Sequence, residues 1–186
     1  MGRTFKGFGT VFQALTRSLR RYRFSYMIVG GWAANYHGMP RATFDIDLVV
    51  KLDGQGLPLV IRMMKRLGFD LRPEDAEQIL RIGNRITVKS SSHPYRIDLW
   101  LIRTAYDQVA FDRRKKGTLL GVTVWFASPE DTILSKLGAD RAKDIEDASS
   151  IVAVQKTRLD WGYLHHWSKL LNVEDKLERL RREHSV

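Results

Sequence analysis

The sequence has no cysteine and no long apolar run, and each absence excludes a class of protein. With 0 cysteines among 186 residues, a disulfide scaffold and a thiolate zinc site are excluded. The longest apolar runs, such as Tyr26–Val29, are far shorter than the roughly 20 residues that a membrane span needs. There is no apolar segment typical of a secretory signal. Because 44% of the residues are hydrophobic, disorder is also excluded, and we expect a folded cytoplasmic protein with no membrane partner.

Acidic residues are absent from the first 26 residues, although these include six basic ones: Arg3, Lys6, Arg17, Arg20, Arg21 and Arg23. A second basic cluster covers residues 113–116, and the whole chain has 31 Lys+Arg against 21 Asp+Glu, a net charge of +10. Such a surface attracts nucleic acid or nucleotide phosphates. A solvated surface that keeps the protein soluble explains the charge equally well, so both interpretations stay open.

The spacing of apolar residues predicts an α/β fold in which strands come first and helices last. We expect strands at 26–29, 45–51, 85–89, 96–102 and 122–126. We expect helices at 12–22, 32–36, 57–67, 128–137, 141–147 and 161–182, with Leu170, Val173, Leu177 and Leu180 on one face of the last. A polar turn at 90–94 would join two of the strands as a hairpin. Ser128 and Pro129 suit the first positions of a helix.

Two carboxylates, Asp45 and Asp47, lie two residues apart on a predicted strand. Side chains at positions i and i+2 of a strand point to the same face, so these carboxylates lie side by side. Neighbouring carboxylates repel each other unless a cation lies between them. Oxygen ligands at this spacing suit Mg²⁺ (or Mn²⁺), which takes its remaining ligands from phosphates. If Asp98 lies on a neighbouring strand, it can bridge a second metal ion.

A glycine pair, Gly30–Gly31, lies between the first predicted strand and a short helix. This arrangement lets backbone N–H groups approach a phosphate, and the helix dipole favours the negative charge. Arg41, four residues before Asp45, can reach the same anion. Singly, a glycine pair is usually a tight turn, and two alternating aspartates are usually a solvated strand edge. In this order along strand, turn, helix and strand, they favour a nucleotide site.

The stretch from Arg41 to Leu48, Arg-Ala-Thr-Phe-Asp-Ile-Asp-Leu, together with Gly30–Gly31 and Asp98, resembles the signature of the DNA polymerase β-like nucleotidyltransferase superfamily. Its form is similar to that of the AbiEii-type branch, which includes toxins of bacterial toxin–antitoxin and abortive-infection systems. Two later blocks, at 128–137 and 141–147, also resemble that branch. The likeness extends from residue 26 to about residue 152.

The resemblance implies a role for each matched residue. Gly30 and Gly31 would hold the nucleotide phosphates, and Asp45 and Asp47 would bind the metal ions. Asp98 matches the third carboxylate, which lies near the acceptor hydroxyl and can act as its base. The other matched residues would contact the nucleotide or the acceptor, or lie at the rim of the site: Arg41, Thr43, Lys136, Arg141, Lys143 and Asp144.

Simpler explanations exist for the residues of the later blocks. Lys136 also fits a lysine of a core helix whose ammonium extends to solvent. Ion pairs on a helix surface, three or four residues apart, would explain Arg141, Lys143, Asp144 and Asp147.

The resemblance implies Mg²⁺-dependent transfer of a nucleoside monophosphate from an NTP to an acceptor hydroxyl. RNA, and tRNA in particular, is the expected acceptor, and the protein would be the toxin of a toxin–antitoxin pair with a cognate antitoxin partner. Two alternatives stay open: transfer of AMP to a protein hydroxyl, and a non-catalytic antitoxin or binding module that retains the fold. We expect a nucleotidyltransferase core at 1–127, with a short mixed β-sheet flanked by helices, and a helical part at 128–186 packed on it.

Overall fold

A computed structural model describes residues 7–52, 56–74, 76, 83, 85–90 and 94–185. The chain forms two compact units, one comprising Met1–Ile28 and Phe44–Phe126, the other Val29–Thr43 and Ala127–Val186. Each is described separately below. Two basic residues of the amino-terminal segment, Arg3 and Lys6, and positions 91–93 of the predicted turn lie outside the described residues.

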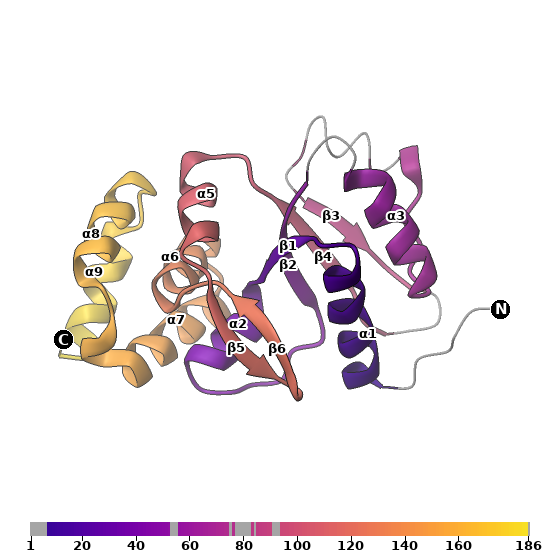
Figure 1. Ribbon diagram of the computed structural model, residues 1–186. Helices are drawn as coiled ribbons and strands as arrows, with labels where there is room; N and C mark the ends of the chain where they lie inside the picture. The colour runs from indigo at the N-terminus through magenta and orange to yellow at the C-terminus, as the bar shows by residue number, and fades with distance from the viewer. Residues whose placement is uncertain are drawn as a thin grey trace. The chain divides into compact units, whose positions relative to one another are not determined.

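The first unit is built on a six-stranded mixed sheet with the strand order β3-β4-β2-β1-β6-β5 (Figure 1). The central strand β1 runs antiparallel to β2 and parallel to β6, and β2 is parallel to β4. The strands are β1 (Ser25–Ile28), β2 (Ile46–Lys51), β3 (Arg85–Val88), β4 (Ile97–Leu101), β5 (Lys115–Leu119) and β6 (Val122–Phe126). The predicted mixed sheet is therefore confirmed.

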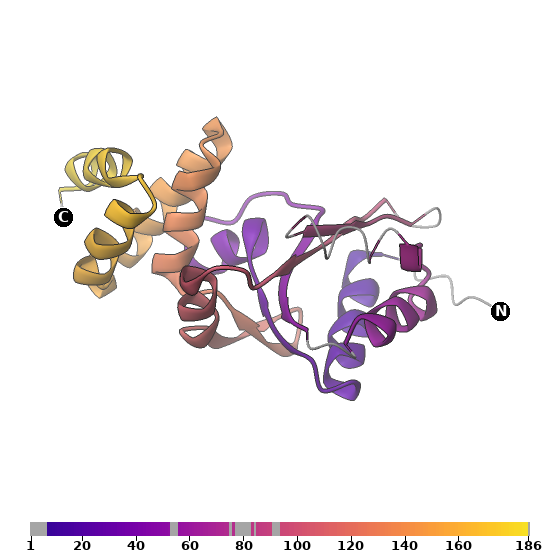
Figure 2. The same cartoon turned by 90° about the horizontal axis from the view of Figure 1, so that it is seen from above.

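Helices α1 (Phe8–Arg21) and α3 (Gly56–Arg66) lie side by side in both ribbon views (Figures 1 and 2). The apolar positions of α1 recur every three or four residues and are buried, including Phe12, Leu15 and Leu19. Arg66, at the end of α3, donates a hydrogen bond of 2.8 Å to the Tyr22 hydroxyl. The amphipathic pattern therefore predicted the buried face of α1 correctly.

The sequence analysis missed helix α5 (Ala105–Asp112) and strand β5. A capping box opens α5, because the Thr104 hydroxyl accepts the Asp107 N–H while the Asp107 carboxylate accepts the Thr104 N–H. This signal is present in the sequence. Strand β5 begins inside the basic cluster and pairs along its length with β6 at the sheet edge. Lysine is depleted in strands generally but is common on edge strands.

The second unit is helical. It contains α2 (Gly30–His37), α6 (Pro129–Ala139), α7 (Ala142–Gln155), a 3₁₀ turn (Lys156–Arg158), α8 (Trp161–Leu170) and α9 (Glu174–Glu183). Helix α6 begins as predicted, with the Ser128 hydroxyl accepting the Asp131 N–H. Nε2 of His37, at the end of α2, lies 2.8 Å from the Ala127 carbonyl oxygen.

The prediction of one helix over 161–182 was wrong, because α8 and α9 are separate. Asn172 between them has φ 56, a left-handed conformation that ends a helix. As a result Leu170 is 61% exposed, whereas Val173, Leu177 and Leu180 are buried.

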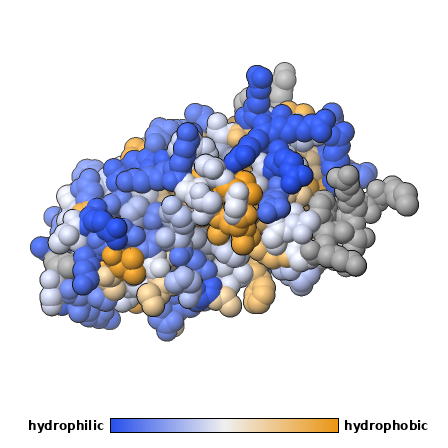
Figure 3. All heavy atoms as spheres, turned by 60° about the horizontal axis from the view of Figure 1, so that its bottom comes forward, coloured by the Kyte–Doolittle hydropathy of each residue, from blue (hydrophilic) through white to orange (hydrophobic). Residues whose placement is uncertain are grey.

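Large exposed apolar side chains are few among the described residues: Tyr36, Met39, Phe44, Leu120, Val154 and Leu170. On the face shown in Figure 3, hydrophilic surface predominates and apolar surface forms small separate patches. No helix in the described part of the chain is long and apolar enough to cross a lipid bilayer.

Candidate functional site

Three aspartates of the first unit gather on one face of the sheet. Asp47 of β2 and Asp98 of β4 are direct partners in the parallel register, so their side chains project from the same face. Asp45 immediately precedes β2 and, two residues from Asp47, shares its orientation. The sheet therefore brings together the three carboxylates that the sequence singled out.

Arg96 lies between two of these carboxylates. Its Nη2 is 2.5 Å from Oδ2 of Asp45, and its Nε is 3.2 Å from Oδ2 of Asp98. The Asp98 side chain is only 3% exposed, whereas those of Arg96 and Asp45 are 43% and 41% exposed. The guanidinium thus supplies the positive charge that neighbouring carboxylates require. The sequence analysis missed Arg96, although its position two residues before Asp98 places both on one face.

The donor chemistry of this face suits a divalent cation. Oδ1 of Asp98 is buried and has no hydrogen-bond partner within the described residues, and such an oxygen is costly unless a cation or donor satisfies it. Carboxylate oxygens are the ligands that Mg²⁺ prefers. No group of three or more Asp, Glu, His or Cys side chains in the described ranges has the geometry to hold a metal ion. With Arg96 between Asp45 and Asp98, a metal would have to displace the guanidinium.

The glycine pair of the second unit forms the start of α2. Gly30 has φ 63, a conformation that favours glycine. No side chain caps this helix end, so its first N–H groups are available to an anion. A Cβ on Gly31 would lie 2.6 Å from Oγ1 of Thr43. Gly31 therefore allows the segment around Thr43 to approach the helix start closely.

Replacing Gly31 by alanine is expected to lower the free energy of unfolding by about 1–3 kcal/mol, because the new Cβ overlaps the Thr43 side chain. The double variant Gly31→Ala, Thr43→Gly, which removes the overlapping atoms, should recover part of the loss relative to Thr43→Gly alone. Urea unfolding of the four proteins measures this coupling. Strictly additive effects would contradict the close approach.

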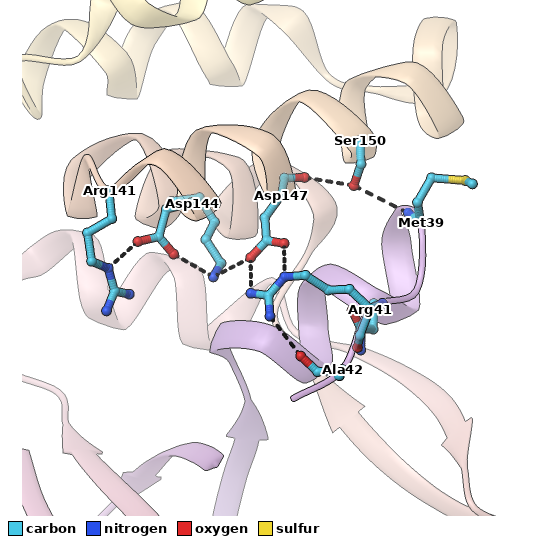
Figure 4. Close-up of polar contacts among 9 residues, drawn as sticks. Met39, Arg41, Ala42, Arg141, Asp144, Asp147 and Ser150 are labelled. Carbon is cyan, nitrogen blue, oxygen red and sulfur yellow. Dashed lines mark hydrogen bonds and ion pairs between the residues drawn. The ribbon is translucent and has the colours of Figure 1, made fainter. Parts of the chain in front are cut away.

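Arg41 is held on both its backbone and its side chain. Its N–H donates to Oδ1 of Asn35 at 3.0 Å, and its carbonyl accepts from Nδ2 of Asn35 at 2.6 Å. The guanidinium donates two hydrogen bonds of 2.6 Å to the carboxylate of Asp147. This bidentate pair connects the segment after α2 to helix α7 (Figure 4).

A buried lysine, Lys136 of α6, connects two carboxylates of α7. Its Nζ lies 2.8 Å from Oδ1 of Asp144 and 2.7 Å from Oδ2 of Asp147, and the three side chains are 7%, 0% and 4% exposed. The Asp144 carboxylate also accepts from Nε of Arg141. We call Arg41, Lys136, Arg141, Asp144 and Asp147 the ion network (Figure 4). In this structure Lys136 does not extend to solvent, and Asp144 and Asp147 are not surface residues.

Hydrogen bonding dominates the protonation of the ion network. Burial by itself would raise the pKa of Asp144 and Asp147, but hydrogen bonds from Arg141, Arg41 and Lys136 outweigh it, so both pKa values lie below the ordinary range. The hydrogen bond to Asp147 raises the pKa of Arg41. Because the folded carboxyls have lowered pKa values, their stabilising effect is present above the unfolded pKa of about 4 and is lost as the pH falls below it.

The sequence-predicted residues therefore form separate groups within their units. The three carboxylates lie together in the first unit, Gly31 lies against Thr43 in the second, and Arg41, Lys136, Arg141 and Asp144 share the ion network. Lys143 is exposed. The nucleotide-binding roles of these residues stay predictions.

Comparisons with known proteins identify a related family and a common fold. Residues 104–183 match the family described as "Nucleotidyltransferase of unknown function (DUF6036)", a description that does not specify the AbiEii-type branch. A comparison with curated proteins found no match.

Solved structures of two antibiotic-modifying proteins are similar to this chain. The antibiotic-resistance factor ANT(2'')-Ia has a TM-score of 0.62 at 17% identity, covering 95% of this chain and 95% of its own. The same factor in complex with adenylyl-2''-tobramycin also has a TM-score of 0.62, at 16% identity over 88% and 96%. The lincosamide antibiotic adenylyltransferase LnuA, lincomycin-bound, has a TM-score of 0.56 at 15% identity over 77% and 96%. At these identities the likeness shows the fold, and it confirms the predicted fold class.

Proposed function

We propose that this chain, which has the nucleotidyltransferase fold, is a Mg²⁺-dependent nucleotidyltransferase that moves a nucleoside monophosphate from an NTP to an acceptor hydroxyl. The observation that carries the proposal is the group of three carboxylates, Asp45, Asp47 and Asp98, on neighbouring strands of one sheet. The family match and the adenylyltransferase structures support the reaction class.

The carboxylates have distinct parts in this proposal. Asp45 and Asp47 hold the metal ions, which would neutralise the phosphates and the leaving pyrophosphate. Asp98, buried and with one oxygen unpartnered in the described part of the chain, takes the proton from the acceptor hydroxyl. The acceptor oxygen then forms a bond to the α-phosphorus, the bond from that phosphorus to the bridging oxygen breaks, and pyrophosphate leaves.

The nucleotide phosphates require positive or N–H groups as well as metal ions. Gly30 and Gly31 supply backbone N–H groups at the uncapped start of α2. Arg96, more exposed than Asp98, can exchange its carboxylate partners for a phosphate when the metal binds. The ion network already occupies Lys136, Arg41 and Arg141 with carboxylates, and any contact of theirs with a nucleotide would compete with those pairs.

The acceptor that we favour is RNA, with tRNA included, and the biological setting that we favour is an AbiEii-type toxin with an antitoxin partner. The net charge of +10 supports an anionic acceptor. The similar structures are titled as an antibiotic-resistance factor and an antibiotic adenylyltransferase, so the hydroxyl of a small molecule is the second candidate acceptor.

Titration of the protein with each NTP in the presence of Mg²⁺ tests the proposal. We expect the wild type to bind at least one NTP, and the Asp45→Ala, Asp47→Ala variant to bind it about 100-fold more weakly or not at all, because the metal ligands are gone. Two exposed aspartates of the same unit, changed in Asp70→Ala, Asp112→Ala, provide a control with equal change of charge. Equal binding by the wild type and the first variant would contradict the assignment.

Incubation with the labelled NTP then identifies the acceptor. Label in total RNA supports the RNA acceptor, and label in a protein of a cell extract supports transfer to a protein hydroxyl. Label on a small molecule of the extract supports the second candidate. If NTP binds to neither protein, a non-catalytic binding module is the better description.

A further inference from the structure

Two basic segments that are distant in the sequence meet in one pocket of the first unit. The pocket has a volume of about 270 Å³ and contains Arg20 from α1 together with Arg114 and Lys116 from the start of β5. Tyr26 of β1 and Thr123 and Trp125 of β6 also line it, and none of its lining residues is acidic. The amino-terminal basic segment and the cluster at 113–116 thus form a single positive site.

Aromatic rings and carbonyl groups hold these cations in place without neutralising them. The Arg114 guanidinium lies 4.3 Å from the centre of the Phe111 ring and 4.9 Å from that of Trp125. It donates to the Phe111 carbonyl at 2.7 Å, while its Nε is buried without a hydrogen-bond partner in the described ranges. The Lys116 ammonium lies 5.1 Å from the Trp125 ring centre.

Arg20 is positioned from the other side of the pocket. Its guanidinium donates to the Thr123 carbonyl and interacts with the buried hydroxyl of Tyr26. Burial raises the pKa of Tyr26 more than Arg20 lowers it, so this hydroxyl stays protonated and can donate a hydrogen bond. Within the part of the chain that the structure describes, none of the three cations forms an ion pair with a carboxylate.

Three positive charges in one hollow repel each other, and an anion removes that cost. A phosphate suits the site because arginine donors and a lysine charge converge on it. The pocket lies at the Ser25 end of β1, while Asp47 lies near the Ile28 end, since Ser25 pairs with Lys51 and Ile28 with Leu48. About three strand residues, roughly 10 Å, therefore separate them.

We propose that this pocket binds a phosphate of a single-stranded RNA. A strand of the length that single-strand binding modules cover, about 4–16 nucleotides, extends over the separation between the pocket and the carboxylates. Exposed arginines of α1, Arg17 and Arg21, add positive charge for neighbouring phosphates. The inference depends on the proposed transfer reaction only where it identifies the RNA as the acceptor.

Fluorescence anisotropy with a labelled, unstructured RNA of about 16 nucleotides, without NTP or metal, tests the inference. We expect the Arg114→Gln, Lys116→Gln variant to bind RNA about 10-fold more weakly than the wild type and to show a salt dependence smaller by about one to two phosphate contacts. The control Lys65→Gln, Lys115→Gln loses the same charge at exposed positions outside the pocket. It should bind nearly as the wild type does.

Further measurements keep the result interpretable. Lys116→Gln alone, at an exposed position, retains the Arg114 packing and should give part of the loss, with an unchanged circular dichroism spectrum. Equal loss in the pocket and control variants would show non-specific charge attraction and would overturn the inference. Equal competition by heparin and by unlabelled RNA would indicate a general polyanion site and would also overturn it.

The experiment separates this inference from the proposed function. A wild type that binds NTP but not RNA would overturn the RNA site and leave the nucleotidyltransferase proposal standing. A wild type that binds RNA through the pocket but binds no NTP would leave the site standing and contradict the transfer reaction.

Discussion

Replacing Lys136 by methionine is expected to lower the free energy of unfolding by about 3 kcal/mol. The substitution retains most of the side-chain volume but removes the ammonium that lies between Asp144 and Asp147. Both carboxylates stay buried and have only one cation each, Arg141 and Arg41. Removing one partner of a buried ion pair typically costs about 3–5 kcal/mol, because the remaining charge is left uncompensated.

Urea unfolding at neutral pH measures this effect. Lys143→Met, at an exposed position of α7, is the matched control and should change the free energy by less than about 0.5 kcal/mol. Because the carboxyl pKa values of Asp144 and Asp147 are lowered in the folded protein, the difference between wild type and Lys136→Met should shrink as the pH falls below about 4. A Lys136→Met variant as stable as the control would show that the ion network is not buried in solution.

Asp98→Asn is expected to decrease nucleotide transfer by about 10²–10⁴-fold while NTP binding changes little. Asparagine has almost the same shape but cannot take a proton, and a general base typically contributes a factor of this size. The position is buried and next to Asp47 on the neighbouring strand, so the substitution leaves the other carboxylates in place. Single-turnover transfer with labelled NTP, once the acceptor is known, separates this chemical step from binding.

The control for Asp98→Asn is Asp112→Asn, an identical chemical change at an exposed position of α5. It should transfer at the wild-type rate. If Asp98→Asn loses NTP binding and transfer in equal proportion, the carboxylate is a metal ligand only. If neither changes, Asp98 lies outside the reacting centre.

Local patterns predicted much of the first unit. The apolar spacing of α1 and the β-forming runs of β1, β2, β4 and β6 reflect burial that each segment needs by itself, and a single sequence records this. The pairing of Asp47 with Asp98 depended on strand order, which the sequence analysis could only state as a condition. Strand β5 was missed because its lysines suit an edge strand, and edge position is a property of the whole sheet.

The ion network could not be predicted from spacing. Arg41 and Asp147 are 106 residues apart, and only the packing of α2, α6 and α7 in one unit brings them together. Arg141 and Asp144, three residues apart, were a plausible surface pair until the burial of Asp144 was known. Burial of a charge depends on every element around it, so the same residues could be interpreted as nucleotide contacts or as surface pairs.

The excursion of Val29–Thr43 into the helical unit has a consequence for dissecting the protein genetically. The chain passes between the two units three times, at 28–29, 43–44 and 126–127, so no single cut separates them. A fragment that ends at residue 127 would keep α2 but lose α6 and α7, against which that helix packs. It would expose the buried side chains of Ala33 and Ala34 and leave Arg41 without Asp147. Deletion mapping by truncation would therefore report misfolding instead of the contribution of either unit, and point substitutions are the informative route.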